Sequence, residues 1–101
     1  MTSLEECIDR FKKGRWECVQ LRDQTLSHHH INGDDVDLLL SRDDFKQIMI
    51  EIYLWVKDGL CNVKVESTSH KKTRVYLYSI DGLMRVTIDF WFVLCQFPNN
   101  S

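Results

Sequence analysis

Two acidic residues stand at the start of an otherwise apolar segment, Asn32-Gly33-Asp34-Asp35-Val36-Asp37-Leu38-Leu39-Leu40. Side chains of an extended strand alternate between two faces, so Asp35 and Asp37 share one face about 7 Å apart. Beyond Asp37 both faces are apolar, which predicts a central strand over residues 35–41. Such a strand is rigid and would hold two carboxylates at a spacing that suits a shared divalent metal ion.

A long amphipathic helix is predicted directly after this strand. Ser41 is a suitable cap, and Asp43 and Asp44 place negative charge in the first turn, where the helix dipole favours it. The apolar positions recur at helical spacing as far as Gly59, and they form one inward stripe: Phe45, Ile48, Met49, Ile52, Trp55 and Val56.

The N-terminal part of the chain predicts a shorter helix. Ser3 and Glu6 have the spacing of a capping box, and Gly14 marks the end of the pattern. The apolar positions between them lie at i, i+3, i+4 and i+7: Leu4, Cys7, Ile8 and Phe11. Residues 16–21 then favour a strand, and the polar residues 23–34 favour a loop that leads into the acidic strand.

After Gly59 the apolar residues alternate with polar ones, which predicts strands. Cys61, Val63 and Val65 carry one strand, and Val75 and Leu77 carry another. The basic run 71–74 between them, after His70, is interpreted as a solvated turn, with a phosphate contact as the alternative. Asp81-Gly82 predicts a tight hairpin into a final strand from Leu83, in which Val86, Ile88 and Phe90 oppose Arg85, Thr87, Asp89 and Trp91. The fold expected is α+β, with two helices packed on one mixed sheet of about five strands.

Length and composition indicate one domain over residues 1–101. The 101 residues are 44% hydrophobic and 28% charged, as in ordinary globular proteins. Lys and Arg number 13 against 15 acids, which gives no support for nucleic acid as a partner. No apolar run reaches the ~20 residues of a membrane span, and no export segment is recognisable at the N-terminus, so a cytoplasmic protein is expected.

The four cysteines are widely spaced and lack a C-x-x-C pair, which favours buried reduced thiols over disulfides or zinc. They are Cys7, Cys18, Cys61 and Cys95. The histidines His28, His29 and His30 would suit zinc, nickel or copper in an extended segment, since alternate residues then point the same way. Because no Cys or Glu stands at ligand spacing, a solvated turn is the favoured interpretation, with contact to a triphosphate as an alternative.

Asp89 gives the acidic strand a candidate third carboxylate. If its strand neighbours residues 35–41, Asp35, Asp37 and Asp89 converge, and their mutual repulsion must be relieved by a proton, an Arg or a bound Mg²⁺. Two metal ions about 4 Å apart could then serve phosphoryl or nucleotidyl transfer, with Asp89 on the side of the nucleophile. The alternative is a surface turn at 32–35, an exposed Asp37, and Asp89 paired with Arg85 or Arg74 across the sheet.

The chain has a D-x-D strand, then a helix, and then the closing strand Val86-Thr87-Ile88-Asp89-Phe90. In this arrangement it resembles the nucleotidyltransferase superfamily that includes polymerase β. The similarity covers roughly residues 16–92 and is greatest to small bacterial members associated with sugars and polysaccharides or with antibiotic modification. It implies Mg²⁺ or Mn²⁺ held by Asp35, Asp37 and Asp89, and a nucleoside triphosphate as substrate. It also implies a role for Gly33 at the phosphates.

Three further expectations concern binding. Arg22 would lie near the carboxylates and suits a phosphate, or else it pairs with Asp23 or Asp35. Tyr76, Tyr78 and Trp91 can stack a base or sugar, although cross-strand packing is the favoured role. The six apolar residues 90–95 need cover on both faces, which predicts a homo-oligomer formed through the last strand.

Two functions from different classes are therefore expected. The first is a minimal nucleotidyltransferase, or a vestigial form of one, that moves a nucleotidyl group from a Mg²⁺-bound nucleoside triphosphate to a hydroxyl. The second is a non-catalytic homo-oligomeric interaction module in which the acids are surface charge. A response of thermal stability to Mg²⁺ that depends on Asp35 and Asp37 separates the two.

Overall fold

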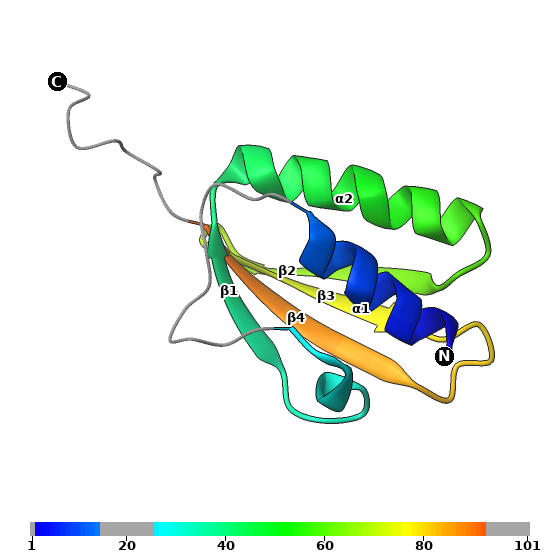
Figure 1. Ribbon diagram of the computed structural model, residues 1–101. Helices are drawn as coiled ribbons and strands as arrows, with labels where there is room; N and C mark the ends of the chain where they lie inside the picture. Colours follow the sequence, from blue (N-terminus) through cyan, green and yellow to red (C-terminus); the bar gives the residue numbers. More distant parts are fainter. Residues whose placement is uncertain (1, 15–25, 93–101) are drawn as a thin grey trace, which may run out of the picture.

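The computed structural model describes residues 2–14 and 26–92 and has an α+β fold, with two helices and a four-stranded mixed sheet (Figure 1). The elements in chain order are α1 (Ser3–Lys13), the 3-10 turn η1 (His28–His30), β1 (Val36–Leu40), α2 (Arg42–Lys57), β2 (Asn62–Ser69), β3 (Lys72–Tyr78) and β4 (Arg85–Phe92). The α+β class is confirmed. The expected strand at 16–21 lies outside the described residues, as do Arg22, Cys18 and Cys95.

The strands are arranged in the order β1-β4-β3-β2. β1 is parallel to β4, with Val36 beside Ile88, whereas β4 with β3 and β3 with β2 are antiparallel. Among the described strands, β4 and β3 are therefore inner and β1 stands at one end of the order, where the sequence predicted a central strand. The parallel pair is closed by a crossover through α2, β2 and β3, and it brings the acidic strand beside the last one.

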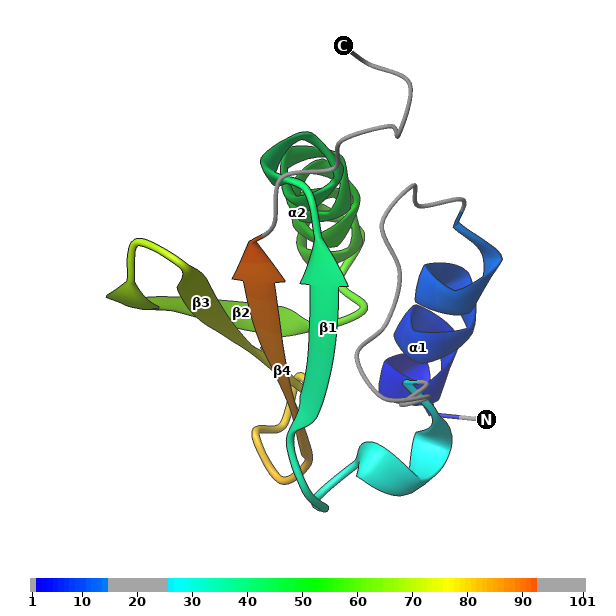
Figure 2. The same ribbon diagram turned by 90° about the vertical axis from the view of Figure 1, so that its left-hand side faces the viewer.

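Both helices lie on the same side of the sheet (Figure 1 and Figure 2). Phe90 of β4 packs against both of them. Its ring centroid lies 6.5 Å from that of Phe11 in α1 and 5.3 Å from that of Phe45 in α2. The expected stripe of α2 is confirmed, since Ile48, Met49, Ile52 and Trp55 are buried and Phe45 and Val56 are partly buried against them. The opposite side of the sheet, here called the outer face, carries the polar residues of the alternating strands.

The cap of α1 differs by one residue from the sequence prediction. Thr2, not Ser3, is the cap: its hydroxyl accepts from the Glu5 backbone N–H at 3.2 Å, and its own N–H donates to the Glu5 carboxylate at 2.7 Å. Both Thr2 with Glu5 and Ser3 with Glu6 fit the motif, so spacing alone does not choose between them. The cap of α2 is as predicted, since the Ser41 hydroxyl accepts from the Asp44 N–H at 3.1 Å.

Two strand boundaries also differ from the prediction. Lys72, Thr73 and Arg74 belong to β3 rather than to a solvated turn, because Thr73 is buried on the helix side and its neighbours point to the outer face. The connection from β3 to β4 is not a tight hairpin but the loop 79–84. There the Asp81 carboxylate accepts from the Ser79 hydroxyl and the Leu83 N–H, and Gly82 supplies the positive φ of 77°.

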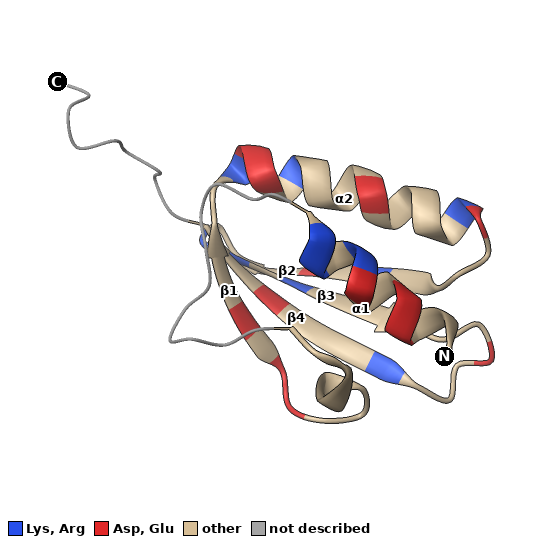
Figure 3. Cartoon of the chain, in the orientation of Figure 1, with Lys and Arg blue, Asp and Glu red and all other residues tan. Residues whose placement is uncertain are grey.

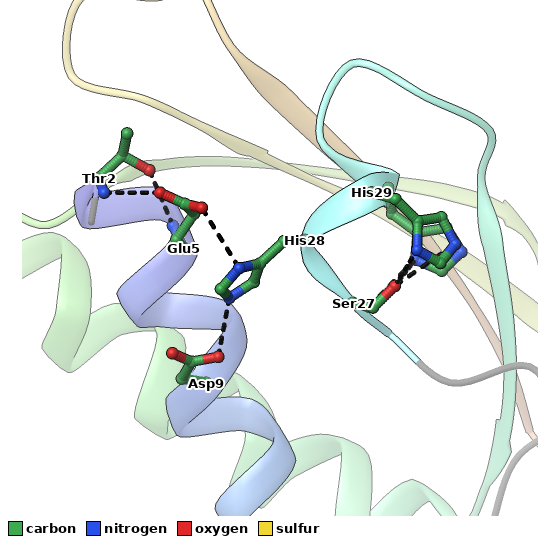
Figure 4. A network of polar contacts seen from close by, with 7 residues as sticks. Thr2, Glu5, Asp9, Ser27, His28 and His29 are labelled. Atoms are coloured by element: carbon green, nitrogen blue, oxygen red, sulfur yellow. Dashed lines mark hydrogen bonds and ion pairs between the residues drawn. The ribbon is translucent and has the colours of Figure 1, made fainter.

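The turn η1 is tied to α1 through His28 (Figure 4). His28 Nε2 lies 2.8 Å from Asp9 Oδ1, and Nδ1 lies 3.2 Å from Glu5 Oε2. Glu5 and Asp9 are one helical turn apart, so a single imidazole contacts both carboxylates. The link holds the polar segment before β1 against the first helix.

Cys7 and Cys61 are free and fully buried, as the sequence predicted for them. The Cys7 thiol donates a hydrogen bond to the neighbouring Cys61 sulfur, and this bond together with burial raises the pKa of Cys7, which keeps that thiol protonated. None of the described helices has the length and apolar character needed to cross a membrane.

Candidate functional site

Asp37 and Asp89 are direct neighbours on parallel strands. Asp37 in β1 is in register with Asp89 in β4, and Val36 is in register with Ile88 one position earlier. Val36 and Ile88 are fully buried on the helix side, so the two aspartates point to the outer face. Figure 3 shows acidic positions side by side on these two strands. The condition that the strand of Asp89 neighbours the acidic strand is therefore met.

Arg74 joins the acidic residues. It lies in β3 directly across from Asp89, and it donates to both oxygens of that carboxylate, from Nε at 2.7 Å and from Nη2 at 3.0 Å. The same Nη2 donates to Asp35 Oδ2 at 2.9 Å. Asp35 immediately precedes β1, so one guanidinium links three segments of the chain: β3, β4 and the entrance to β1. This two-point geometry is one that Arg provides and Lys does not.

Lys72 adds a second cation to the same carboxylate. Its Nζ lies 3.5 Å from Asp89 Oδ2, and the Asp89 side chain is only 3% exposed. Burial by itself raises the pKa of Asp89, but the hydrogen bonds and positive charge of Arg74, with a smaller effect of Lys72, outweigh it and hold that pKa below its ordinary value. Asp89 in turn raises the pKa of Arg74, so the pair stays ionised.

Asp37 is contacted by an aromatic residue of β4. The Trp91 indole Nε1–H donates to Asp37 Oδ1 at 3.0 Å, and the Lys72 ammonium lies 4.9 Å from the centroid of the Trp91 ring. Lys72 thus lies against both Asp89 and the indole that binds Asp37. The outer face therefore carries a connected set of residues, here called the carboxylate cluster: Asp35, Asp37, Lys72, Arg74, Asp89 and Trp91.

The two tyrosines of the outer face pack against each other and against basic side chains. The Tyr76 and Tyr78 rings are stacked, with centroids 6.1 Å apart. Lys64 and Arg85 lie 5.7 and 5.8 Å from the Tyr76 centroid. These contacts correspond to the packing role that the sequence favoured for the tyrosines.

The backbone of the turn before β1 requires a glycine at position 33. A Cβ at this position would lie 2.7 Å from the backbone oxygen of His29, which is too close for any side chain. The Gly33 backbone N–H donates to the His30 backbone oxygen at 3.1 Å, so this N–H is used within the turn. Its neighbour Asn32, at φ 57°, anchors the segment: it exchanges hydrogen bonds with the backbone of Arg85 through its own N–H at 2.7 Å and its side-chain oxygen at 2.9 Å.

The three histidines form a turn, not the extended segment that the metal interpretation assumed. His30 Nδ1 accepts from the Ser27 N–H at 3.1 Å, and the His29 and His30 rings lie 4.3 Å apart. His28 points to α1 instead. Alternate side chains therefore do not face one ligand.

The donor chemistry of the carboxylate cluster suits Mg²⁺ or Mn²⁺, since hard cations prefer carboxylate oxygens. Its arrangement does not suit a metal ion at Asp89, because Arg74 occupies both oxygens and Lys72 adds a second positive charge. Within residues 2–14 and 26–92, no three His, Cys, Asp or Glu side chains are grouped so as to hold a metal ion. As arranged, protein cations contact two of its three carboxylates, Asp35 and Asp89.

The sequence identified the three aspartates of the carboxylate cluster but gave too little weight to its two basic residues, Lys72 and Arg74. Arg74 entered only as one of two possible partners of Asp89, and Lys72 was assigned to a turn. The available signal was the period-two pattern, which extends back from Val75 through Thr73 and places Lys72 and Arg74 on the face of Asp89. Comparisons with protein-family models, with curated proteins and with solved structures found no match to this chain.

Proposed function

We propose that this chain is a nucleotidyltransferase-like domain without a working metal centre, and that it acts as a non-catalytic interaction module. One observation carries the proposal: Arg74 binds both oxygens of Asp89 and one oxygen of Asp35. Repulsion between neighbouring carboxylates can be relieved by a cation, and here the cation belongs to the protein. The cluster then stabilises the sheet, where in an active enzyme it would bind metal.

The energetics favour this arrangement over a metal ion at the same place. The Arg74 side chain is 28% exposed and the Asp89 side chain only 3%, so removing the guanidinium would leave a nearly buried charge without its closest partner. Leaving a buried charge unpaired costs roughly 3–5 kcal/mol. A divalent ion at Asp89 would itself pair with that carboxylate, but it would have to displace the Arg74 guanidinium and bind beside the Lys72 ammonium.

An active nucleotidyltransferase is the second candidate, and the register favours it. Asp37 lies beside Asp89 on the same face, as a two-metal site would require. In this case Mg²⁺ with a nucleoside triphosphate would displace Arg74, whose guanidinium would be free to bind the phosphates. Homo-oligomer formation through the last strand remains a prediction, because residues 93–95 lie outside the described part of the chain.

Thermal unfolding with Mg²⁺ or Mn²⁺ and ATP or GTP separates the two candidates. A ligand at about ten times its dissociation constant raises the midpoint of a domain of this size by about 5–10 °C. We expect no such shift for the wild-type protein. Arg74→Met uncovers the carboxylates and should produce a metal-dependent shift, and adding Asp37→Asn to that variant should remove it.

Arg85→Met is the matched control, because Arg85 also lies on the outer face but contacts the Tyr76 ring rather than the acids. It should not gain a response to metal. A wild-type protein that Mg²⁺ with a nucleoside triphosphate stabilises, and that loses this response with Asp37→Asn, would overturn the proposal in favour of the active enzyme.

A further inference from the structure

β2 is an edge strand with its side chains largely uncovered. It ends the order of the described sheet and pairs there with β3 alone. Of its eight residues, only Val63 is partly buried and the rest are exposed. Val65 is 41% exposed, whereas its cross-strand partner Val75 is fully buried. The apolar face of the sheet therefore continues onto β2 without the cover it has elsewhere.

The edge of β2 lacks several of the features that usually prevent strand pairing. Proteins protect edges with proline, very short strands or inward-facing charges. β2 contains no proline, and its inward positions along the regular ladder are Val63, Val65 and Ser67. Its single register shift lies between Ser67 and Ser69, at the far end. Along 63–67, the backbone groups of β2 that point away from β3 therefore pair with no other strand among residues 2–14 and 26–92.

The sequence of β2 is complementary to itself in one register. Antiparallel pairing of two copies about a two-fold axis at Val65 places Val65 opposite its own copy. The same pairing places Lys64 opposite Glu66 of the second copy, twice by symmetry. Val63 then faces Ser67. Both charges lie on the outer face, opposite Tyr76 and Arg74 of their own chain, so the Lys-Glu pairs and the valine contact occupy opposite faces.

The registers nearest to this one are disfavoured by charge or by face. Moving the axis by one residue, to Lys64 or to Glu66, sets that residue against its own copy and creates a like-charge contact. An axis that falls between two residues sets Val65 opposite a charged residue of the other face, because the side-chain period is two. The Val65-centred register avoids both problems.

We propose that β2 pairs with β2 of a second copy of this chain in that register, forming a continuous eight-stranded sheet with the helices of both copies on one side. The interface is isologous, as two-fold dimers require. The backbone hydrogen bonds supply adhesion, and the Lys64-Glu66 pairs select the register. This gives the interaction module a partner, but it rests on residues outside the carboxylate cluster, so either proposal can fail without the other.

Sedimentation equilibrium over a concentration series tests the pairing. Lys64→Glu and Glu66→Lys each convert two attractive contacts into two repulsive ones, and each should weaken the dimer about ten-fold. An equimolar mixture of the two variants should recover dimers, because every repulsive pair then becomes a Lys-Glu pair. The double variant Lys64→Glu with Glu66→Lys should also recover them. Unfolding midpoints verify that each variant is folded, since Glu66 lies across from Arg74.

A cross-linking measurement keeps the test independent of the charge variants. A short bismaleimide should join two copies of Val65→Cys efficiently, and it should join two copies of Lys71→Cys poorly, because Lys71 lies outside the paired segment. Wild-type protein that stays monomeric up to about 1 mM overturns the proposal. So does a dimer that both charge variants leave unchanged and that Val65→Cys does not cross-link.

Discussion

At the scale of single residues, Arg74 and Asp89 determine what the outer face can do. Asp89 is a buried acid that stays ionised because two cations contact it, and Arg74 reaches a second acid, Asp35, outside the sheet. The exposed ion pair with Asp35 contributes little by itself, since about half of that carboxylate is in contact with water. The buried pair accounts for most of the stabilisation.

Asp89→Asn should make the protein less stable at neutral pH and less sensitive to acid. The pKa of Asp89 is lowered in the folded state, so its contribution is complete above the ordinary Asp value of about 3.9 and is lost as the pH falls through the folded-state pKa. We expect a loss of roughly 2–4 kcal/mol in the free energy of unfolding at pH 7. Urea unfolding of both proteins from pH 7 to pH 2 should show the two stabilities converging below about pH 4.

Asp34→Asn is the control for that measurement, because Asp34 is an exposed loop residue. Its unfolding free energy should remain within about 0.5 kcal/mol of wild type at every pH. Two curves for wild type and Asp89→Asn that stay parallel down to pH 2 would contradict the assignment of Asp89 as a stabilising ionised group.

At the scale of elements, the helices were easier to predict than the strand ends. The α2 stripe repeats with the helical period over about three turns, and that signal needs no partner. The start of β3 depends on where its outer residues find partners. Lys72 and Arg74 look like a turn until Asp89 is known to lie across from Arg74 and within 3.5 Å of Lys72. The one-residue error at the cap of α1 arose because two overlapping pairs satisfy the same motif.

Two glycine substitutions should destabilise their turns for different reasons. Gly33→Ala brings a Cβ to 2.7 Å from the His29 oxygen, so the backbone before β1 must move, and we expect a loss of about 2–3 kcal/mol. Gly82→Ala meets no atom within 4 Å but must keep a φ of 77°, which costs about 1 kcal/mol. Thermal unfolding compares them. Equal losses in the two variants would argue against the close contact at Gly33.

At the scale of the whole molecule, one phenylalanine holds both helices to the sheet. Phe90 is fully buried between Phe11 and Phe45, whereas Phe92, two residues later on the same strand, contacts Phe45 and the Arg42 guanidinium and is only partly buried. Residues on one strand with the same side-chain type thus differ in how much of the fold depends on them.

Phe90→Ala should cost about 3–5 kcal/mol and loosen α1 and α2 together, because it leaves a cavity where side chains of α1, α2 and the sheet meet. Phe92→Ala should cost only about 1–2 kcal/mol, since less area is uncovered. Denaturant unfolding measures the losses, and hydrogen exchange shows which helices lose protection. Loss of protection in only one helix would contradict the shared contact.

The composition of the candidate site was predictable, but its pairing was not. Asp35, Asp37 and Asp89 were recognisable because charges in apolar strands are unusual. That Asp37 lies beside Asp89, and that Arg74 lies across from it, depends on strand order and register, which arise from contacts between residues far apart in the chain. Local periodicity carries no information about which strands become neighbours.

The parallel pairing of β1 with β4 also constrains the order in which the chain folds. β2, β3 and β4 follow one another and pair with their sequence neighbours, so they can form an antiparallel meander from short-range contacts. β1 leaves the ribosome well before its partner Ile88 exists, and it cannot dock until β4 is complete. Closure of this long loop is therefore expected to be the slow step of folding. Until then the apolar segment Leu38–Leu40 lacks its partner β4, and the adjacent aspartates help to keep it in solution.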